Sequence, residues 1–113
     1  MLCSLLFLLQ ACIAPDNSYL MELNRSGKWN EVEKIGLDML AKLGTFSHSE
    51  ICETYFHVIY AKTRLGKKQE AVKLMMEYDE FSARESIDPK LLWLNREMAK
   101  LKNELGMLSE VQH

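Results

Sequence analysis

Proline and glycine are scarce in this chain of 113 residues, which contains two Pro and five Gly. Both residues interrupt helices, because Pro lacks a backbone N–H group and Gly loses more conformational freedom on folding than other residues do. Met, a good helix former, occurs seven times. A chain of this length supports one domain with a single core. These counts together predict an all-α fold.

Cysteine and histidine are also scarce, with three of each in the sequence. Three widely spaced cysteines make neither a disulfide framework nor a metal cluster, and the histidines lack metal-ligand spacing. His57 follows Cys52 by five residues and would lie well round a helix from it, so we interpret Cys52 as a small buried apolar residue. We therefore predict no metal and no cofactor. The residues considered are Cys3, Cys12, Cys52, His48, His57 and His113.

A strong charge of one sign is absent as well. The 14 basic and 16 acidic residues are mixed along the chain and give a formal net charge of −2. No basic stripe could neutralise a row of phosphates, which makes nucleic acid a poor candidate partner. Neither a glycine-rich phosphate loop nor a nucleophile elbow occurs in the sequence. We therefore predict that the protein is not an enzyme, and we expect no small-molecule substrate.

The first 14 residues carry no charge and are almost entirely apolar. This is the length of a signal-peptide core and is shorter than the roughly 20 residues of a membrane-spanning helix. Within it, the run Leu8-Leu9-Gln10-Ala11-Cys12 resembles the lipobox of bacterial lipoproteins. That motif has a branched apolar residue three positions before the cysteine and a small residue immediately before it.

The lipobox resemblance implies that the peptide is cut just before Cys12 and that its thiol is acylated. Residues 1–11 would be a signal peptide, residues 12–18 a tether and residues 19–113 the helical domain. Because Ile13 and not Asp follows the cysteine, the resemblance implies a lipid anchor in the outer membrane, facing the periplasm. The alternative is that residues 1–14 form the first apolar helix of a soluble cytoplasmic bundle.

Five helical segments are expected after residue 16. The first spans 17–26 and stops at Gly27, and the second spans 28–43 and stops at Gly44. A capping box, Ser47-His48-Ser49-Glu50, predicts the start of a third and central helix that ends at Gly66. A fourth helix spans 67–84, and a fifth begins at Asp88-Pro89.

The fifth segment has the most regular apolar stripe in the chain. We interpret this segment as a terminal helix that covers the open end of the bundle. The alternative is that residues 91–108 pair with a second copy of the chain. The stripe comprises Leu91, Leu94, Met98, Leu101, Leu105 and Leu108.

Two stretches of the sequence repeat one pattern. Gly27-Lys28-Trp29-Asn30-Glu31-Val32 and Gly66-Lys67-Lys68-Gln69-Glu70-Ala71 each place a glycine before a polar stretch, then Glu and a small or β-branched residue. This pattern resembles the turn and second-helix start of a tetratricopeptide repeat. The two glycines are 39 positions apart, whereas that family repeats every 34 residues, and we expect the extra residues in the 44–49 turn.

The resemblance implies about two antiparallel helical hairpins whose first helices line a concave face that holds a peptide. Phe56 and Tyr60 would anchor the partner there, although packing in the core is the alternative role for both. The function implied is a membrane-anchored scaffold or assembly factor of the cell envelope that binds a protein or peptide. The groove residues implied are Asn17, Met21, Asn24, Glu53, Phe56, Tyr60 and Thr63.

Overall fold

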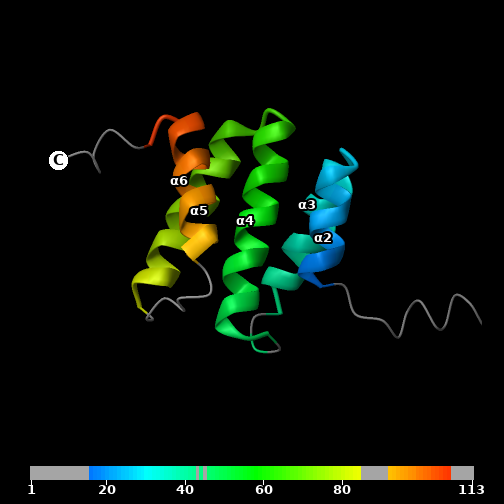
Figure 1. Cartoon of the computed structure of the whole chain (residues 1–113), viewed down its shortest axis with the longest axis horizontal. Helices are drawn as coiled ribbons and strands as arrows, with labels where there is room; N and C mark the ends of the chain where they lie inside the picture. The colour runs from blue at the N-terminus through cyan, green and yellow to red at the C-terminus, as the bar shows by residue number, and fades with distance from the viewer. Residues whose placement is uncertain (1–15, 43, 45, 85–91, 108–113) are drawn as a thin grey trace, which may run out of the picture.

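The computed structural model describes residues 16–42, 44, 46–84 and 92–107. Within these ranges the chain forms five α-helices and no strand (Figure 1). The all-α prediction and the antiparallel hairpins are therefore confirmed. The helices are α2 (Asn17–Arg25), α3 (Trp29–Leu40), α4 (His48–Arg64), α5 (Lys68–Ala83) and α6 (Leu92–Glu104).

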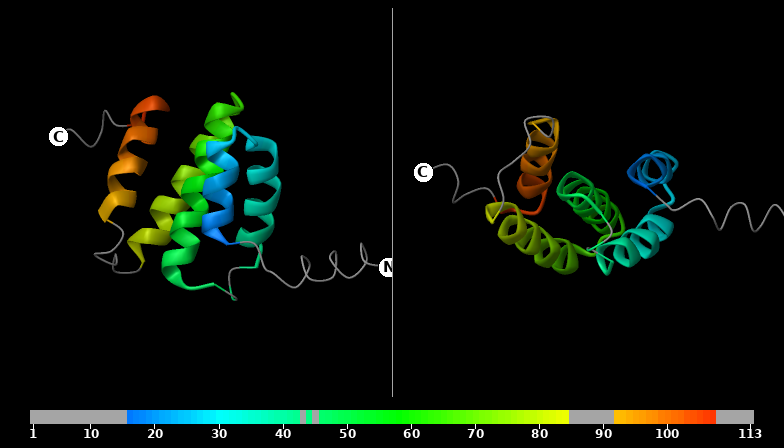
Figure 2. Two further views of the ribbon diagram at one scale, coloured as in Figure 1. Left: turned by 45° about the vertical axis from the view of Figure 1, so that its right-hand side comes forward. Right: turned by 90° about the horizontal axis from the view of Figure 1, so that it is seen from below.

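The helices are arranged in two curved layers (Figure 2). Helices α2, α4 and α6 run in the same direction and form the inner layer, while α3 and α5 form the outer layer. Each outer helix returns antiparallel to the helix before it, so α2 and α3 form one hairpin and α4 and α5 a second. Helix α4 packs between the others, as expected for the central helix.

The glycine turns and the capping box form as predicted. Gly27 and Gly66 have positive φ angles of 74° and 78°, a conformation that L side chains rarely adopt. The Glu50 backbone N–H donates to Ser47 Oγ at 3.2 Å, and the Ser47 N–H donates to Glu50 Oε1 at 2.9 Å. Asp16 caps α2, which begins at Asn17, the residue predicted for the start of the first helix.

Helix α3 is shorter than predicted. It ends at Leu40, where the N–H groups of Ala41 and Lys42 close the last turn, and the expected stop at Gly44 is wrong. Gly44 also lacks the positive φ of the other turn glycines. The buried residues of α3 are Val32, Gly36 and Met39.

Gly36 allows α3 and α4 to approach closely. A Cβ atom at this position would lie 2.2 Å from Cγ2 of Val58, a distance at which something must shift. This contact belongs to the junction between the two hairpins, where a first core cluster lies. Its buried members are Leu20, Leu23, Val32, Met39 and Ala61.

A second core cluster joins α4, α5 and α6. Four members of the predicted α6 stripe, Leu94, Met98, Leu101 and Leu105, are buried in it, whereas the first and last members of the stripe lie outside the described residues. The terminal helix thus covers the core of its own chain.

Two asparagine side chains fix α2 against α4. Asn17 Nδ2 donates to the carbonyl oxygen of Glu50 at 3.1 Å, and Asn24 Nδ2 donates to that of His57 at 3.2 Å. Each bond joins residues 33 positions apart, close to the 34-residue period of tetratricopeptide repeats.

The additional residues between the two turn glycines lie in α4 and not in the 44–49 turn. This correction follows because the two helices keep their 33-residue offset up to His57. Beyond that point α4 continues past the end of α2, and it has 17 residues where α2 has nine. The central helix is therefore long enough to contact both hairpins and α6.

Candidate functional site

A cavity of about 440 Å³ opens between the three helices of the inner layer. This volume is within the usual range of ligand sites, about 300 to 1,000 Å³. We call it the inner groove and define it by its lining residues. These are Met21, Asn24 and Arg25 from α2, Phe56, His57 and Tyr60 from α4, and Trp93 and Glu97 from α6.

The floor of the inner groove is aromatic. Phe56 and Tyr60 lie on one face of α4 because they are four residues apart. The Phe56 ring centroid is 6.1 Å from that of Tyr60 and 6.1 Å from that of Trp93, which meets it edge-on at 88°. Trp93 is 39% exposed and Met21 is 40% exposed. Apolar surface is thus open to solvent on both walls.

Four of the seven predicted groove residues line this cavity, namely Met21, Asn24, Phe56 and Tyr60. Phe56 and Tyr60 are half-buried and also pack against the second core cluster, so they combine the two roles that the sequence left open. Glu53 is not among the lining residues, but it lies one helical turn before Phe56 on the same face of α4, next to the inner groove.

Asn17 and Thr63 are not among the residues that line the inner groove. Asn17 bonds to α4 through its amide, as described above, and its Oδ1 accepts from the Thr54 hydroxyl at 3.1 Å. The Thr63 hydroxyl donates to the carbonyl oxygen of Ile59, one turn earlier in its own helix, at 2.8 Å. Both side chains use their polar atoms inside the protein.

Sequence reasoning missed Arg25, His57, Trp93 and Glu97 as groove residues. The leucine stripe of α6 predicts a cover or a seam with a second copy, whereas its third place in the inner layer follows from packing. A local signal was present, because Trp93 and Glu97 are four residues apart and lie off the leucine stripe.

His57 is a neutral histidine in the wall of the inner groove. It is 4% exposed, and burial lowers its pKa to about 4, so the imidazole is uncharged at neutral pH. Its Nδ1 and the Oδ1 of Asn24 are buried and have no hydrogen-bond partner within the described ranges. Unsatisfied buried polar atoms are uncommon and are costly to stability.

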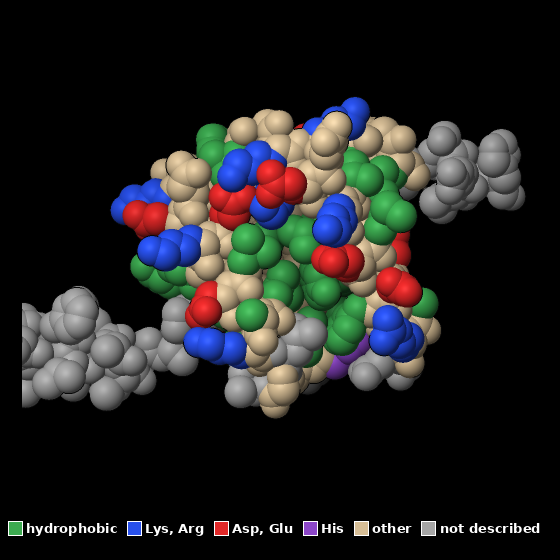
Figure 3. All heavy atoms as spheres, turned by 180° about the vertical axis from the view of Figure 1, so that it is seen from behind, with side chains coloured by type: hydrophobic (Ala, Val, Ile, Leu, Met, Phe, Trp, Pro, Cys, Tyr) green, Lys and Arg blue, Asp and Glu red, His purple; other side chains and the backbone are tan. Residues whose placement is uncertain are grey.

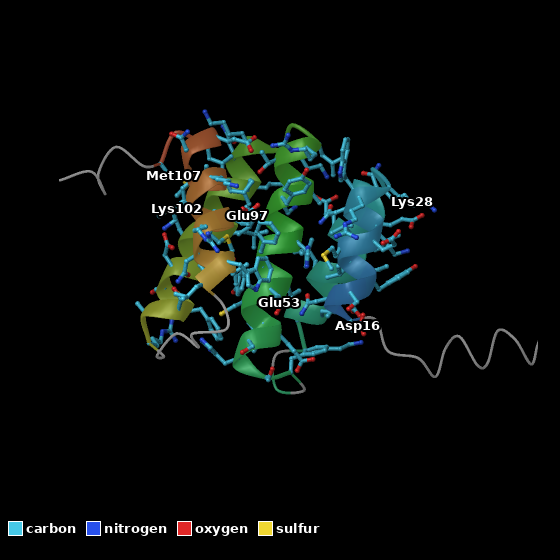
Figure 4. The ribbon with its side chains drawn as sticks, viewed as in Figure 1. Asp16, Lys28, Glu53, Glu97, Lys102 and Met107 are labelled. Atoms are coloured by element: carbon cyan, nitrogen blue, oxygen red, sulfur yellow. The ribbon has the colours of Figure 1, made fainter. Side chains whose placement is uncertain are left out.

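Glu53 is a half-buried carboxylate on α4. Among the described residues it forms no hydrogen bond and no ion pair. Burial raises its pKa, and the nearby charge of Glu50 raises it further. Figure 4 shows Glu53 on α4 between α2 and α6, and Glu97 extending from α6 toward α4.

The opposite face of the protein belongs to α3 and α5. Figure 3 shows apolar side chains gathered in the middle of this face among charged side chains. Met76 of α5 is 61% exposed and Leu37 of α3 is 38% exposed. Both lie outside the inner groove, which makes Met76 a useful control position.

The buried Cys52 has a histidine neighbour other than the one considered from the sequence. Its Sγ lies 3.6 Å from Nε2 of His48, one turn earlier in α4, and the His48 ring stacks on Phe81 at 4.8 Å. Cys52 is only 2% exposed, which confirms its interpretation as a buried small residue.

The remaining features bear on the predicted anchor and ligands. The predicted lipidation site, Cys12, lies outside the described residues. Helices long and apolar enough to cross a bilayer do not occur in the part of the chain that the structure describes. In that same part, no group of three potential metal-ligating side chains comes together.

No protein-family model, curated protein or solved structure matches this chain.

Proposed function

We propose that this protein is a binding module whose inner groove receives a peptide segment of a partner protein. One observation carries this proposal: Met21, Phe56, Tyr60 and Trp93 share one cavity that opens to solvent. Apolar surface of this kind, with charged residues at its edge, marks interaction sites. Aromatic side chains contribute a large part of the binding energy at such sites.

The arrangement of the helices supports the resemblance to tetratricopeptide repeats. Two antiparallel hairpins stack with their first helices in parallel, and the asparagine bonds relate those helices by 33 residues. In a repeat of this type the first helices form the concave face. The inner groove lies on the corresponding face here, between α2, α4 and α6.

We further propose that the module is held at the bacterial outer membrane through an acylated Cys12 and serves there as a scaffold or assembly factor. The lipobox-like run before Cys12 supports this part of the proposal. A diacylglyceryl group gives firm attachment, since each buried methylene contributes about 0.8 kcal/mol.

The alternative is a soluble module that self-associates through residues 91–108. The packing of α6 favours the first reading, because Leu94, Met98 and Leu101 are at most 2% exposed within one chain. The four seam residues that the structure describes, Leu94, Met98, Leu101 and Leu105, are already in the core.

The groove is tested with two neighbouring residues of α6. Crosslinked partners are captured from the native host with the full chain and with the variants Trp93→Ala and Leu92→Ala. Trp93 lines the inner groove, whereas Leu92 is 61% exposed and does not line it. We expect a specific partner to be lost with Trp93→Ala and retained with Leu92→Ala. Equal capture by the two variants would contradict the proposal.

A methionine pair provides a second comparison. Met21→Glu places a charge in the inner groove, and Met76→Glu places one on the outer face, where the side chain is 61% exposed. We expect only the first substitution to abolish capture. Circular dichroism spectra of both variants show whether the fold is kept.

The anchor is tested separately with the cysteines of the leading segment. Cells that express the full chain are labelled with a palmitate analogue and fractionated. Cys12→Ser should lose the label and leave the membrane pellet, whereas Cys3→Ser should keep both. A Cys12→Ser protein that is still labelled and still pellets refutes the anchor and leaves the groove proposal standing.

A further inference from the structure

We infer that the inner groove is selective for a basic segment, in which a lysine or arginine lies next to a bulky apolar residue. This inference rests on the proposed function and adds the chemical class of the partner. The charge distribution along α4 and the aromatic floor of the groove carry it.

Glu53 supplies the first argument. Its carboxylate is half-buried on the face of α4 that forms the groove floor, and no cation of the described chain neutralises it. A carboxylate in such a place is unfavourable until a cation pairs with it. A basic side chain from the partner would provide that cation. Burial has already removed part of the water that would otherwise compete for the carboxylate.

The aromatic floor supplies the second argument. The Arg64 guanidinium, which also pairs with Glu104, lies 5.0 Å from the ring centroid of Tyr60, so that ring already carries a cation of its own chain. Phe56 precedes Tyr60 on α4 and therefore lies nearer to Glu53, and Trp93 lies across the groove on α6. They provide apolar surface for the stem of a lysine or arginine and for the neighbouring apolar residue.

Two charged residues line the inner groove itself, Glu97 and Arg25. Glu97 adds a second carboxylate on the α6 wall, where it pairs with the exposed Lys100 of its own helix at 2.9 Å. Arg25 is the one cation among the lining residues, and it lies at the C-terminal end of α2. The Asn24 bond places that end level with His57, a turn beyond Glu53.

This polarity sets where the basic residue binds. A cation would be repelled near Arg25 and attracted near Glu53, so the basic residue is directed to the N-terminal half of α4. His57 does not add a positive charge to the floor at neutral pH, because its imidazole is buried and neutral. Among the described residues, the carboxylate of Glu53 is therefore unopposed at one end, whereas charges of both signs, Arg25 and Glu97, line the other end.

The test begins with an unbiased selection. A phage-displayed library of random 12-residue peptides is selected on the full chain, after removal of phage that bind the Trp93→Ala variant. We expect the selected peptides to be enriched in lysine or arginine beside leucine, phenylalanine or another bulky apolar residue. Enrichment in acidic residues, or in apolar residues alone, would overturn the inference.

Affinity measurements then connect the preference to Glu53. Synthetic copies of the selected peptides are measured by fluorescence anisotropy, together with versions in which the basic residue is replaced by glutamine. Glu53→Gln should weaken binding of the basic peptides about tenfold and leave the glutamine versions unchanged. The control is Glu31→Gln, because Glu31 is exposed on α3 in the outer layer, and it should have no effect.

The outcomes separate this inference from the proposed function. Peptides that need Trp93 but show no dependence on Glu53 or on a basic residue refute the charge preference and support the groove. A selection that yields no peptide dependent on Trp93 contradicts both proposals.

Discussion

Helix α4 has two buried basic side chains, His57 and Lys62, whose pKa values are shifted in opposite directions. Each residue is 4% exposed. Burial lowers the pKa of His57 to about 4, and the ring stays neutral. Burial opposes the charge of Lys62 as well, but hydrogen bonds to Glu33 at 2.6 Å and Glu70 at 2.7 Å outweigh it and raise the pKa of Lys62.

The difference distinguishes the end of α4 whose charged side chains find partners within the protein from the end whose polar side chains do not. Lys62 joins α3, α4 and α5, and Lys67 also contacts Glu33, at 2.8 Å, so this group of charges is complete. The groove end of α4 is incomplete, because neither a hydrogen-bond partner for His57 Nδ1 nor a cation for Glu53 occurs within the described ranges. We interpret the first region as a structural clamp, and the second belongs to the surface that we propose for partner binding.

Removal of the clamp lysine should have the largest effect. Lys62→Ala leaves Glu33, whose side chain is 15% exposed, without its closest cation. Breaking a buried ion pair in this way typically costs about 3 to 5 kcal/mol. Urea denaturation at neutral pH measures the free energy of unfolding. Lys68→Ala, at an exposed position of α5, is the control, with an expected change within about 0.5 kcal/mol. A loss for Lys62→Ala below about 1 kcal/mol would show that Lys62 does not act as a clamp.

The pH dependence of stability should report His57 next. Its folded pKa is lowered from 6.5 to about 4, so the unfolded chain binds more protons between those values and stability falls as pH decreases through that window. The shift corresponds to a loss of about 3 kcal/mol between pH 6.5 and 4. His57→Gln should flatten the profile in this window, and thermal unfolding across the pH series measures it. An unchanged slope would show that His57 is not the titrating group.

The two carboxylates of the clamp should differ from each other by a smaller amount. Glu33→Gln should cost about 1 to 3 kcal/mol, because a buried charged hydrogen-bond network loses its anion. Glu70→Gln should cost less than about 1 kcal/mol, because the Glu70 side chain is 59% exposed. Urea denaturation of both variants at neutral pH gives the comparison.

Glu33 also has its own pH signature. Hydrogen bonds from Lys62 and Lys67 lower its pKa below the ordinary 4.5, so its contribution is present above pH 4.5 and is lost as pH falls through the folded pKa. Glu33→Gln should therefore reduce the acid-induced loss of stability below pH 4.5 and leave the His57 window unchanged. Equal acid profiles for Glu33→Gln and the unmodified protein would exclude this assignment.

Local patterns in the sequence predicted most of the fold. Gly27 and Gly66 marked the hairpin turns, Ser47 and Glu50 marked the start of α4, and the leucine stripe marked the buried face of α6. Each of these signals acts within a few residues, so the sequence contains it directly. The end of α3 was missed because Gly44 was taken as its stop, although the last turn closes three residues earlier.

Long-range polar pairing was not predictable in the same way. Lys62 and Glu33 are 29 positions apart, and nothing near Lys62 in the sequence indicates a buried lysine. The same limit applies to the candidate site. The repeat resemblance placed Met21 and Phe56 on one face, but the contribution of Trp93 depends on how α6 packs against α4.

The asparagine bonds between α2 and α4 have a mechanical consequence for the inner groove. Asn17 and Asn24 hold α2 at two points about two helical turns apart, so sliding of one helix along the other would break both bonds at once. The two bonds therefore fix the position of α2, one wall of the inner groove, relative to α4. The opposite wall is held differently, because α6 is joined to α4 and α5 through the ion pairs Arg64–Glu104 and Lys102–Asp79.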